Sequence, residues 1–155
     1  MESGSKIILI AEDEENLRTL YAEDLRDEGY QVVLAQNGKE ATEAIERIPI
    51  DLIILDIVMP VMDGMEALGR IIGRHKDIPI ILYSSYPHYK DDFMSWAADA
   101  YVMKSSDLTE LKEMIRFLLE KERRGSSKSD ALKREIHCDE NKRAGEQKGQ
   151  LQLLR

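Results

Sequence analysis

Three carboxylates stand where apolar segments of the sequence end. Glu12 and Asp13 directly follow the apolar run Ile7–Ala11, and Asp56 directly follows Leu52–Leu55. In a parallel α/β sheet the carboxyl ends of the strands share one edge, so these acids converge if the two strands are neighbours. Packed carboxylates repel one another unless a cation lies among them, and Mg²⁺ prefers such hard oxygen ligands. One acid alone more often caps the next helix, but three acids with further partners favour a magnesium site.

A hydroxyl group and an ammonium group follow two further apolar runs. Ser84 comes after the run Ile80–Tyr83, and Lys104 comes after Ala100–Met103. At the same sheet edge, the ammonium would pair with a phosphoryl group on Asp56 as a point charge, and the hydroxyl would donate to a phosphate oxygen. Each residue alone is as readily a turn serine or a surface lysine. Their shared position at strand ends favours a site for a phosphorylated carboxylate.

The elements that position these residues alternate regularly along the chain. Short apolar runs alternate with stretches whose apolar residues recur at helical spacing. This order predicts an α/β fold with a doubly wound five-stranded parallel sheet covered on both faces and right-handed crossovers. Gly29 is the expected stop of the first helix, and Asp107 is the expected N-cap of the last. We expect strands at residues 7–11, 31–35, 52–55, 80–83 and 100–103, and helices around 15–28, 41–48, 65–72, 89–98 and 108–118.

Length and charge limit the other functions. The 155 residues suffice for one domain with a proper core, and they carry a net charge of -8,. Residues 1–120 hold 12 Lys and Arg against 24 Asp and Glu, whereas residues 121–155 hold 10 against 6. The acidic part argues against direct binding of nucleic acid, whose phosphate backbone would repel it. We predict one domain over residues 1–123, followed at 124–155 by a linker and a mobile or partly helical tail.

Cysteine usage and hydropathy indicate a cytoplasmic location. Cys138 is the single cysteine, so no internal disulfide is expected and no zinc cluster can be built around it,. The residues before Ile7 contain no apolar stretch of the kind found in a signal peptide,. The longest apolar runs are far shorter than the roughly 20 residues needed to span a bilayer. We therefore expect no contact with a membrane.

Four segments carry a family resemblance. Glu12-Asp13 forms an acidic pair, Leu55–Gly64 contains Asp56 and the turn after it, Pro79–Ser85 carries a hydroxyl, and Tyr101–Lys104 carries an aromatic residue and a lysine. In this order they resemble the acidic pair, the phosphoacceptor segment, the switch strand and the final strand of a response-regulator receiver domain. The phosphoacceptor segment is highly specific, and the resemblance covers about three quarters of the chain. It implies a flavodoxin-like (βα)5 fold with strand order 2-1-3-4-5.

The resemblance also implies a role for each residue. Asp56 would be the phosphoacceptor that attacks a phosphohistidine, and Lys104 would pair with the phosphoryl group. Ser84 would move toward that group, and Tyr101 would swing from an exposed to a buried rotamer; alternatively, Tyr101 is a half-buried aromatic that does not move. The surface around the last strand and its flanking helices would then change shape. Mg²⁺ would be held by Glu12, Asp13, Asp56 and the backbone carbonyl of Val58.

Two departures from the family pattern affect loops near the site. Ser105 follows Lys104 where receivers usually have proline, often with a cis bond. A cis bond here would cost about 3 kcal/mol, so we expect either a trans bond with a shifted loop or a strained cis bond. Residues 96–99 lack the glycine that usually precedes the fifth strand, so the helix before it is expected to end differently. Trp96 is either an output or dimer contact or a partly packed core residue.

A third departure concerns the lifetime of the phosphoryl group. Val58 and Tyr86 lie two positions past Asp56 and Ser84, where receivers tune hydrolysis through their side chains. An apolar residue and a bulky aromatic residue should hinder an attacking water molecule. Our hypothesis is a long-lived phosphoryl group.

The preferred interpretation is a stand-alone response regulator. No DNA-binding or catalytic domain fits in the 35 residues from 121 to 155. The chain would be a switch that catalyses its own phosphorylation and dephosphorylation rather than an enzyme of another class. It would signal to a downstream protein or relay the phosphoryl group. Its expected donor is a sensor histidine kinase or a histidine phosphotransfer protein, which would contact the first helix at Leu17, Arg18, Leu20 and Tyr21.

Other interpretations stay open at this point. The sequence could be the receiver part of a longer transcription factor or hybrid kinase, or a pseudo-receiver that binds partners without accepting phosphate. A phosphatase with the same aspartyl chemistry would need a second acid close to Asp56, and Val58 occupies the obvious position. The chain would be a monomer or a dimer linked to phosphorylation.

Overall fold

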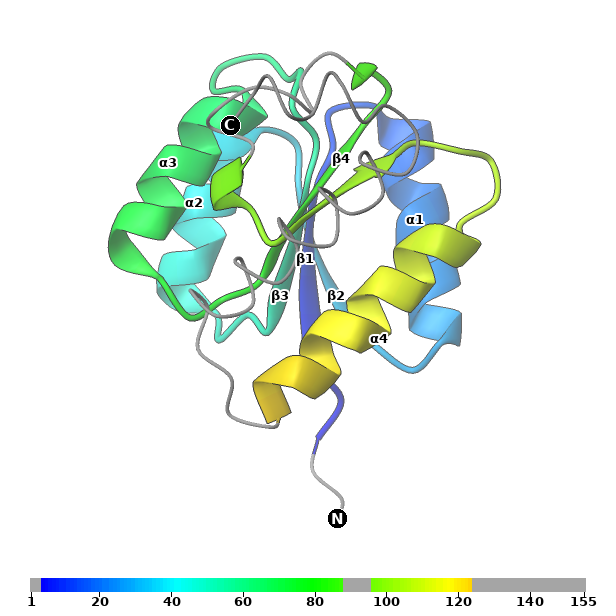
Figure 1. Ribbon diagram of the computed structural model, residues 1–155. Helices are drawn as coiled ribbons and strands as arrows, with labels where there is room; N and C mark the ends of the chain where they lie inside the picture. Colours follow the sequence, from blue (N-terminus) through cyan, green and yellow to red (C-terminus); the bar gives the residue numbers. More distant parts are fainter. Residues whose placement is uncertain (1–3, 88–95, 124–155) are drawn as a thin grey trace, which may run out of the picture.

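The computed structural model describes residues 4–87 and 96–123, with only the backbone for Glu122 and Arg123 (Figure 1). Through residue 84, strands and helices alternate as the sequence predicts. The predicted helix at 89–98 lies mostly outside the described residues, and the predicted tail at 124–155 lies wholly outside them. The elements are β1 Ile7–Ala11, α1 Glu15–Asp27, β2 Gln31–Ala35, α2 Gly38–Arg47, β3 Leu52–Leu55, α3 Gly64–Arg74, β4 Ile80–Ser84, β5 Ala100–Met103 and α4 Thr109–Arg123.

All five strands run parallel in the order β2-β1-β3-β4-β5, which confirms the predicted fold class. β1 pairs with both β2 and β3, and its last residue, Ala11, lies opposite Ala35 and Leu55. At the other side of the sheet, Ser84 of β4 lies opposite Met103 of β5. Because these strand ends are in register, the residues that follow them meet at one edge of the sheet.

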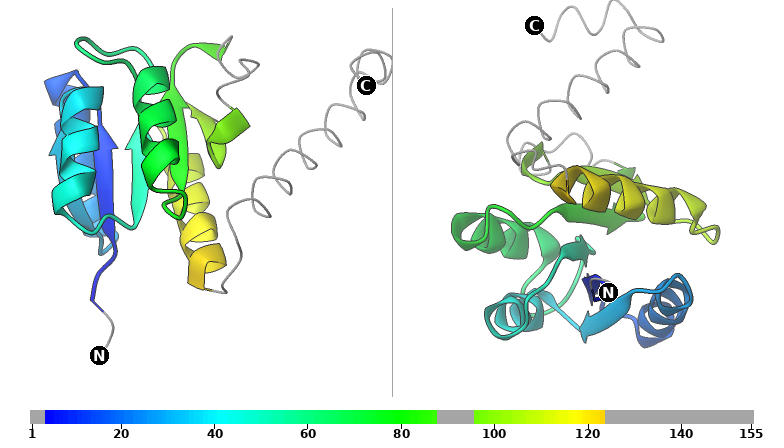
Figure 2. Two further views of the ribbon diagram at one scale, coloured as in Figure 1. Left: turned by 90° about the vertical axis from the view of Figure 1, so that its left-hand side faces the viewer. Right: turned by 90° about the horizontal axis from the view of Figure 1, so that it is seen from below.

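The sheet is covered on both faces, as Figures 1 and 2 show. Leu9 and Leu55 belong to a core cluster that contains the inward residues of α2 and α3. Ile10, Ile54 and Tyr83 belong to a second cluster with α1 and α4. Side chains of β1, β3 and β4 therefore alternate between two apolar layers, which explains why these strands are apolar throughout. No helix within the described residues has the length and hydropathy of a membrane span.

Helix ends follow local sequence signals. At the start of α2, Asn37 Oδ1 accepts a hydrogen bond from the N–H of Glu40 at 2.9 Å. At the start of α4, Asp107 Oδ1 accepts from the N–H of Thr109 at 2.9 Å, as its predicted capping role requires,. After α1, Gly29 has a φ of 100°, so the predicted glycine stop is confirmed,.

Two acids fix the strand starts at the opposite edge of the sheet. Asp51 Oδ2 accepts from the N–H of Ile7, and Asp99 Oδ2 accepts from the N–H of Ile80, each at 2.8 Å. Asp99 is 2% exposed, and its own N–H donates to the carbonyl oxygen of Ile80 at 2.9 Å. Among the described residues, Val61 is the one non-glycine with a positive φ. The chain therefore enters β5 without the glycine that the family pattern leads one to expect.

Gly64 packs directly against the backbone that follows β3. Its N–H donates to the carbonyl oxygen of Ile57 at 2.7 Å. A Cβ at this position would overlap the carbonyl oxygen of Asp56 and lie 2.7 Å from Cα of Ile57. Backbone atoms cannot rotate away as a side chain can, so only glycine allows α3 to start this close to the end of β3.

Replacing this glycine should destabilise the fold. We expect Gly64→Ala to lower the free energy of unfolding by about 2–3 kcal/mol, because α3 must move away from the strand end. Denaturant unfolding followed by circular dichroism measures this change. Gly73→Ala on the same helix is the control: an added Cβ there meets nothing within 4 Å, and the higher helix propensity of alanine should stabilise by up to about 1 kcal/mol. Equal effects of the two substitutions would contradict the proposed close approach.

Candidate functional site

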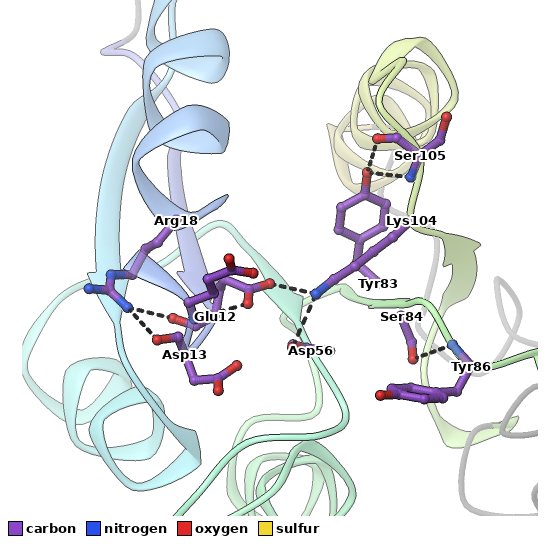
Figure 3. A network of polar contacts seen from close by, with 10 residues as sticks. Glu12, Asp13, Arg18, Asp56, Tyr83, Ser84, Tyr86, Lys104 and Ser105 are labelled. Carbon is purple, nitrogen blue, oxygen red and sulfur yellow. Dashed lines mark hydrogen bonds and ion pairs between the residues drawn. The ribbon is translucent and has the colours of Figure 1, made fainter. Parts of the chain in front are cut away.

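Three carboxylates meet at the carboxyl edge of the sheet, as the sequence predicts (Figure 3). Glu12 and Asp13 follow β1, Asp56 follows β3, and one oxygen of each lies within 4.8 Å of the others. Glu12 is 2% exposed and Asp56 is 5% exposed, whereas Asp13 is exposed. The cluster therefore has two buried members and one member at the surface.

Arg18 of α1 anchors the acid pair. Its Nη1 donates to the carbonyl oxygens of Glu12 at 2.8 Å and of Asp13 at 3.3 Å. One carboxylate oxygen of Glu12 accepts from the N–H of Glu14 at 3.1 Å. These bonds fix the turn between β1 and α1. The sequence assigned Arg18 to a partner contact, and the structure adds this role within the chain.

Lys104 bridges two of the acids. Its Nζ lies 2.7 Å from Oε1 of Glu12 and 3.2 Å from Oδ2 of Asp56, and its side chain is 13% exposed. Its backbone N–H donates to the carbonyl oxygen of Ser84 at 2.8 Å. No peptide bond among the described residues is cis, so the bond between Lys104 and Ser105 is trans. The lysine reaches the acids without a proline after it.

Burial and neighbouring charges shift the ionisation of this cluster. Burial raises the pKa of Asp56 from 3.8 to about 6; the charge of Lys104 opposes this rise, and the charge of Glu12 adds to it. Burial alone would lower the pKa of Lys104, but its bond to Glu12 and the charge of Asp56 outweigh that effect and raise this pKa. The cluster thus holds three acidic side chains and one ammonium, and negative charge is in excess.

Hydrogen bonds through the backbone of Tyr86 link Ser84 to Tyr101. Ser84 is fully buried, and its Oγ accepts from the N–H of Tyr86 at 3.1 Å. The hydroxyl of Tyr101 donates to the carbonyl oxygen of Tyr86 at 2.5 Å, and its half-buried ring packs against the α2 and α3 side of the core. The predicted switch hydroxyl and switch aromatic are therefore connected. The movement of Tyr101 stays a prediction.

Several exposed apolar side chains lie in the loops at this edge. Val58 and Tyr86 are 45% and 46% exposed, and Val61 is 77% exposed. Val61 has a φ of 68°, a conformation that a β-branched residue rarely adopts,. The roles predicted for the Val58 carbonyl in metal binding and for both side chains in hydrolysis stay predictions. Trp96 is 46% exposed, and its contact role also stays a prediction.

The donor set fits a hard divalent cation. Carboxylate oxygens gathered this closely are the ligands that Mg²⁺ takes, with water and phosphate oxygens completing its shell,. A cation would also offset the negative charge that Lys104 leaves uncompensated. Within residues 4–87 and 96–123, no other group of three such ligands occurs.

The prediction that Tyr21 contacts a partner is wrong. Tyr21 is 3% exposed and packs edge-on against Tyr83, with ring centroids 5.4 Å apart. It therefore faces the core and cannot dock a partner. Leu20, the residue before it, is 49% exposed. The outer face of α1 thus offers Leu20 and excludes Tyr21.

Tyr83 contacts the loop that follows Lys104, a role that its position in the sequence did not predict. Its hydroxyl lies 3.4 Å from both the backbone N and the carbonyl oxygen of Ser105 (Figure 3). The available signal was a tyrosine among the aliphatic residues of a central strand, since a buried tyrosine usually finds a polar partner for its hydroxyl.

Sequence comparisons agree with this geometry. A family model described as the response regulator receiver domain matches residues 8–116. The response regulator RR06 of Streptococcus pneumoniae is 37% identical over 114 residues, which cover 72% of this chain and 52% of RR06. The transcriptional regulatory protein PcoR of Escherichia coli is 32% identical over 118 residues, which cover 75% of this chain and 52% of PcoR. The chain spans about half the length of these relatives.

Structure comparisons find the same fold. The response regulator TrrA of Thermotoga maritima, crystallised with Mg²⁺-BeF, is 47% identical with a TM-score of 0.71, over 73% of this chain and 98% of the TrrA chain. TrrA in complex with the histidine kinase ThkA matches with a TM-score of 0.70, over 74% of this chain and 98% of that chain.

The raised pKa of Asp56 predicts that Asp56→Asn stabilises the fold, and that this stabilisation depends on pH. The folded carboxyl binds its proton more tightly than the unfolded one, so its charge destabilises the fold above about pH 6 and not below about pH 4,. Without divalent cations, Asp56→Asn should raise the free energy of unfolding at pH 7.5 by about 1–3 kcal/mol. The gain should shrink as pH falls from 6 toward 4.

Chemical denaturation at pH 7.5 and pH 4.5 measures this effect. Asp77→Asn, which changes an exposed acid between α3 and β4, is the matched control and should change stability little at either pH. A loss of stability in Asp56→Asn at pH 7.5 would mean that pairing with Lys104 outweighs the effect of burial.

Proposed function

The chain belongs to the response regulator receiver domain family, and we propose that it is a switch that accepts a phosphoryl group from a histidine kinase on Asp56. A receiver is a phosphoacceptor switch rather than an enzyme of the usual kind. The observation that carries the proposal is the buried carboxylate of Asp56 beside the ammonium of Lys104, with the carboxylates of Glu12 and Asp13 within 4.8 Å.

Phosphoryl transfer requires little covalent chemistry from the protein beyond the attack by one carboxylate oxygen. One carboxylate oxygen of Asp56 attacks phosphorus, the bond from phosphorus to the donor atom breaks, and an aspartyl phosphate forms. Most of the acceleration comes from positioning and charge stabilisation. With a pKa of about 6, the carboxyl of Asp56 is largely ionised at pH 7.5. Lys104 already lies 3.2 Å from it and can pair with phosphoryl oxygens,.

Magnesium completes this proposal. Glu12, Asp13 and Asp56, with the backbone carbonyl of Val58, would hold the ion. When bound, Mg²⁺ supplies positive charge to the transferring group. Support comes from the donor chemistry of the three acids and from TrrA, whose crystal structure holds Mg²⁺-BeF.

The signal would pass from Ser84 to the surface of β5 and α4. Ser84 Oγ accepts from the N–H of Tyr86, whose carbonyl oxygen accepts from Tyr101. If Ser84 turns to donate to a phosphoryl oxygen, its bond to Tyr86 is lost and the contact with Tyr101 changes. This is a local charge event that biases a two-state element.

The partner that donates the phosphoryl group would be a histidine kinase docked on α1. TrrA has been crystallised with the histidine kinase ThkA. In this chain, the exposed Leu20 and the half-buried Leu17 lie on α1 next to the acid pair. We propose that these two residues contact the kinase. As one form of output, the chain would pass its phosphoryl group to a histidine phosphotransfer protein.

A stand-alone regulator is our preferred form of the whole protein. The match with TrrA, which covers 98% of that chain, supports it. The relatives RR06 and PcoR favour the other form, a receiver joined to a further part, because this chain matches only about half of each. For the transcriptional regulatory protein PcoR, we expect that part to bind DNA. A mass well above 17.8 kDa for the protein isolated from its native cells would establish the second form.

Phosphorylation by a small donor tests the proposed chemistry. Intact mass measured after incubation with acetyl phosphate and Mg²⁺ should show one added phosphoryl group. Asp56→Asn should show none, and omission of the metal should abolish the gain. Lys104→Ala should slow the reaction by roughly tenfold or more, since one charge partner of the phosphoryl group is lost.

Lys112→Ala is the matched control for the lysine. Lys112 pairs with Asp24, away from the acid cluster, so its loss should leave the rate unchanged. No mass gain in the folded wild-type chain under any condition would leave a receiver-shaped binding module and end the proposal.

The phosphoryl group should persist for minutes rather than seconds. The exposed side chains of Val58 and Tyr86 should hinder an attacking water molecule, so Val58→Ala and Tyr86→Ala should each shorten the half-life by roughly two- to tenfold. Decay of the phosphorylated mass after removal of the donor measures this. Val61→Ala, which removes the same atoms as Val58→Ala from the same loop, is the control and should change the half-life little. A half-life of seconds in the wild type would contradict the hypothesis.

A further inference from the structure

The loop that carries Lys104 is fixed by its backbone rather than by a proline. On one side, the N–H of Lys104 donates to the carbonyl oxygen of Ser84 at 2.8 Å. On the other side, the backbone N and carbonyl oxygen of Ser105 each lie 3.4 Å from the hydroxyl of Tyr83. The Oγ of Ser105 accepts from the N–H of Asp107 at 3.1 Å. Two consecutive residues of β4 therefore hold two consecutive residues of this loop.

The ring of Tyr83 is well placed to act as a rigid support. Tyr83 is 2% exposed and lies on β4, which has a paired strand on each side. Its ring packs against Tyr21 of α1 at a centroid distance of 5.4 Å and an interplanar angle of 68°. Figure 3 shows its hydroxyl pointing to Ser105 while Lys104 extends toward Glu12 and Asp56.

A lysine needs such support because its side chain is long and flexible. The ammonium contacts Glu12 at 2.7 Å and Asp56 at 3.2 Å, while Ser105, the residue after it, is exposed. An exposed loop segment can exchange its backbone hydrogen bonds with water, and a displacement of about 1 Å at a reacting group can reduce a rate by up to roughly 100-fold.

We propose that Tyr83 is a positioning residue that acts through the backbone of Ser105 to hold the Lys104 ammonium against Asp56. The proposal deepens the proposed function and rests on it for its effect on phosphorylation. It concerns the hydroxyl of Tyr83, because the ring alone would pack equally well as phenylalanine.

The test compares two substitutions that each remove one hydroxyl from the same ring pair. Tyr83→Phe should lower the second-order rate of aspartyl phosphate formation from acetyl phosphate with Mg²⁺ by roughly five- to tenfold. Tyr21→Phe removes the hydroxyl of the partner ring and should leave the rate within about twofold. Equal losses in the two variants would overturn the proposal in favour of a general packing effect.

A double-substitution cycle separates positioning from a structural effect. In a Lys104→Ala background, Tyr83→Phe should lower the rate no further, because its effect passes through the missing ammonium. An undiminished five- to tenfold loss in that background would mean that Tyr83 acts elsewhere, and the proposal would fail.

Chemical labelling tests the positioning without relying on phosphorylation. The rate of acetylation of Lys104 by acetic anhydride, measured by peptide mass spectrometry relative to Lys112, should rise several-fold in Tyr83→Phe and not in Tyr21→Phe. An unchanged ratio would overturn the proposal even if the wild type is phosphorylated. A raised ratio in a chain whose wild type accepts no phosphoryl group would support the positioning role and refute the proposed function alone.

Discussion

The confinement of three carboxylates at one edge of a parallel sheet is the constraint on which the rest of the structure depends. Two of them, Glu12 and Asp56, are buried, and a buried charge is tolerated only when it is paired or neutralised. Lys104 contacts both and compensates only part of the charge. Burial is the main cause that raises the pKa of Asp56, the charge of Glu12 adds to the rise, and Lys104 opposes it only in part. A cation bound among these carboxylates would therefore stabilise the site. Because Asp56 is 5% exposed, its carboxylate has little water around it.

Strand register brings these charges together. Ala11 lies opposite Leu55, so the residues after β1 and β3 are neighbours although more than 40 positions separate them in the sequence. Ser84 lies opposite Met103, which places Lys104 one residue beyond the β4–β5 ladder. The sheet core holds the side chains that directly follow its strands in fixed positions. The two apolar layers on either side of β1, β3 and β4 thus stabilise the site as well as the fold.

The sequence predicted the parts of this structure that depend on local pattern. Apolar runs between amphipathic stretches predicted the strands, and acids directly after two of those runs predicted the convergence. The burial of Tyr21 was not predicted, because helical spacing does not tell which apolar residue lies at the margin of a buried face. The bonds of Asp99 to Ile80 and of Tyr83 to Ser105 depend on which strands are adjacent and in what register. The positive φ of Val61 was not predicted either, because it runs against the preference of its own side chain,.

β4 and the residues just after it connect the chemistry to both sides of the sheet. The carbonyl oxygen of Ser84 accepts from the N–H of Lys104 at 2.8 Å, in line with the strand ladder, and Tyr83 supports the same loop from the α1 and α4 layer. The hydroxyl of Ser84 instead bonds to Tyr86 at 3.1 Å in a loop, and Tyr86 in turn accepts from Tyr101. A change at the hydroxyl of Ser84 can therefore rearrange the loop while the strand ladder stays intact. The bond to Lys104 and the contacts that lead to Tyr101 depend on different atoms of Ser84. Under the proposed switching, the surface would therefore change while Lys104 keeps its place beside Asp56.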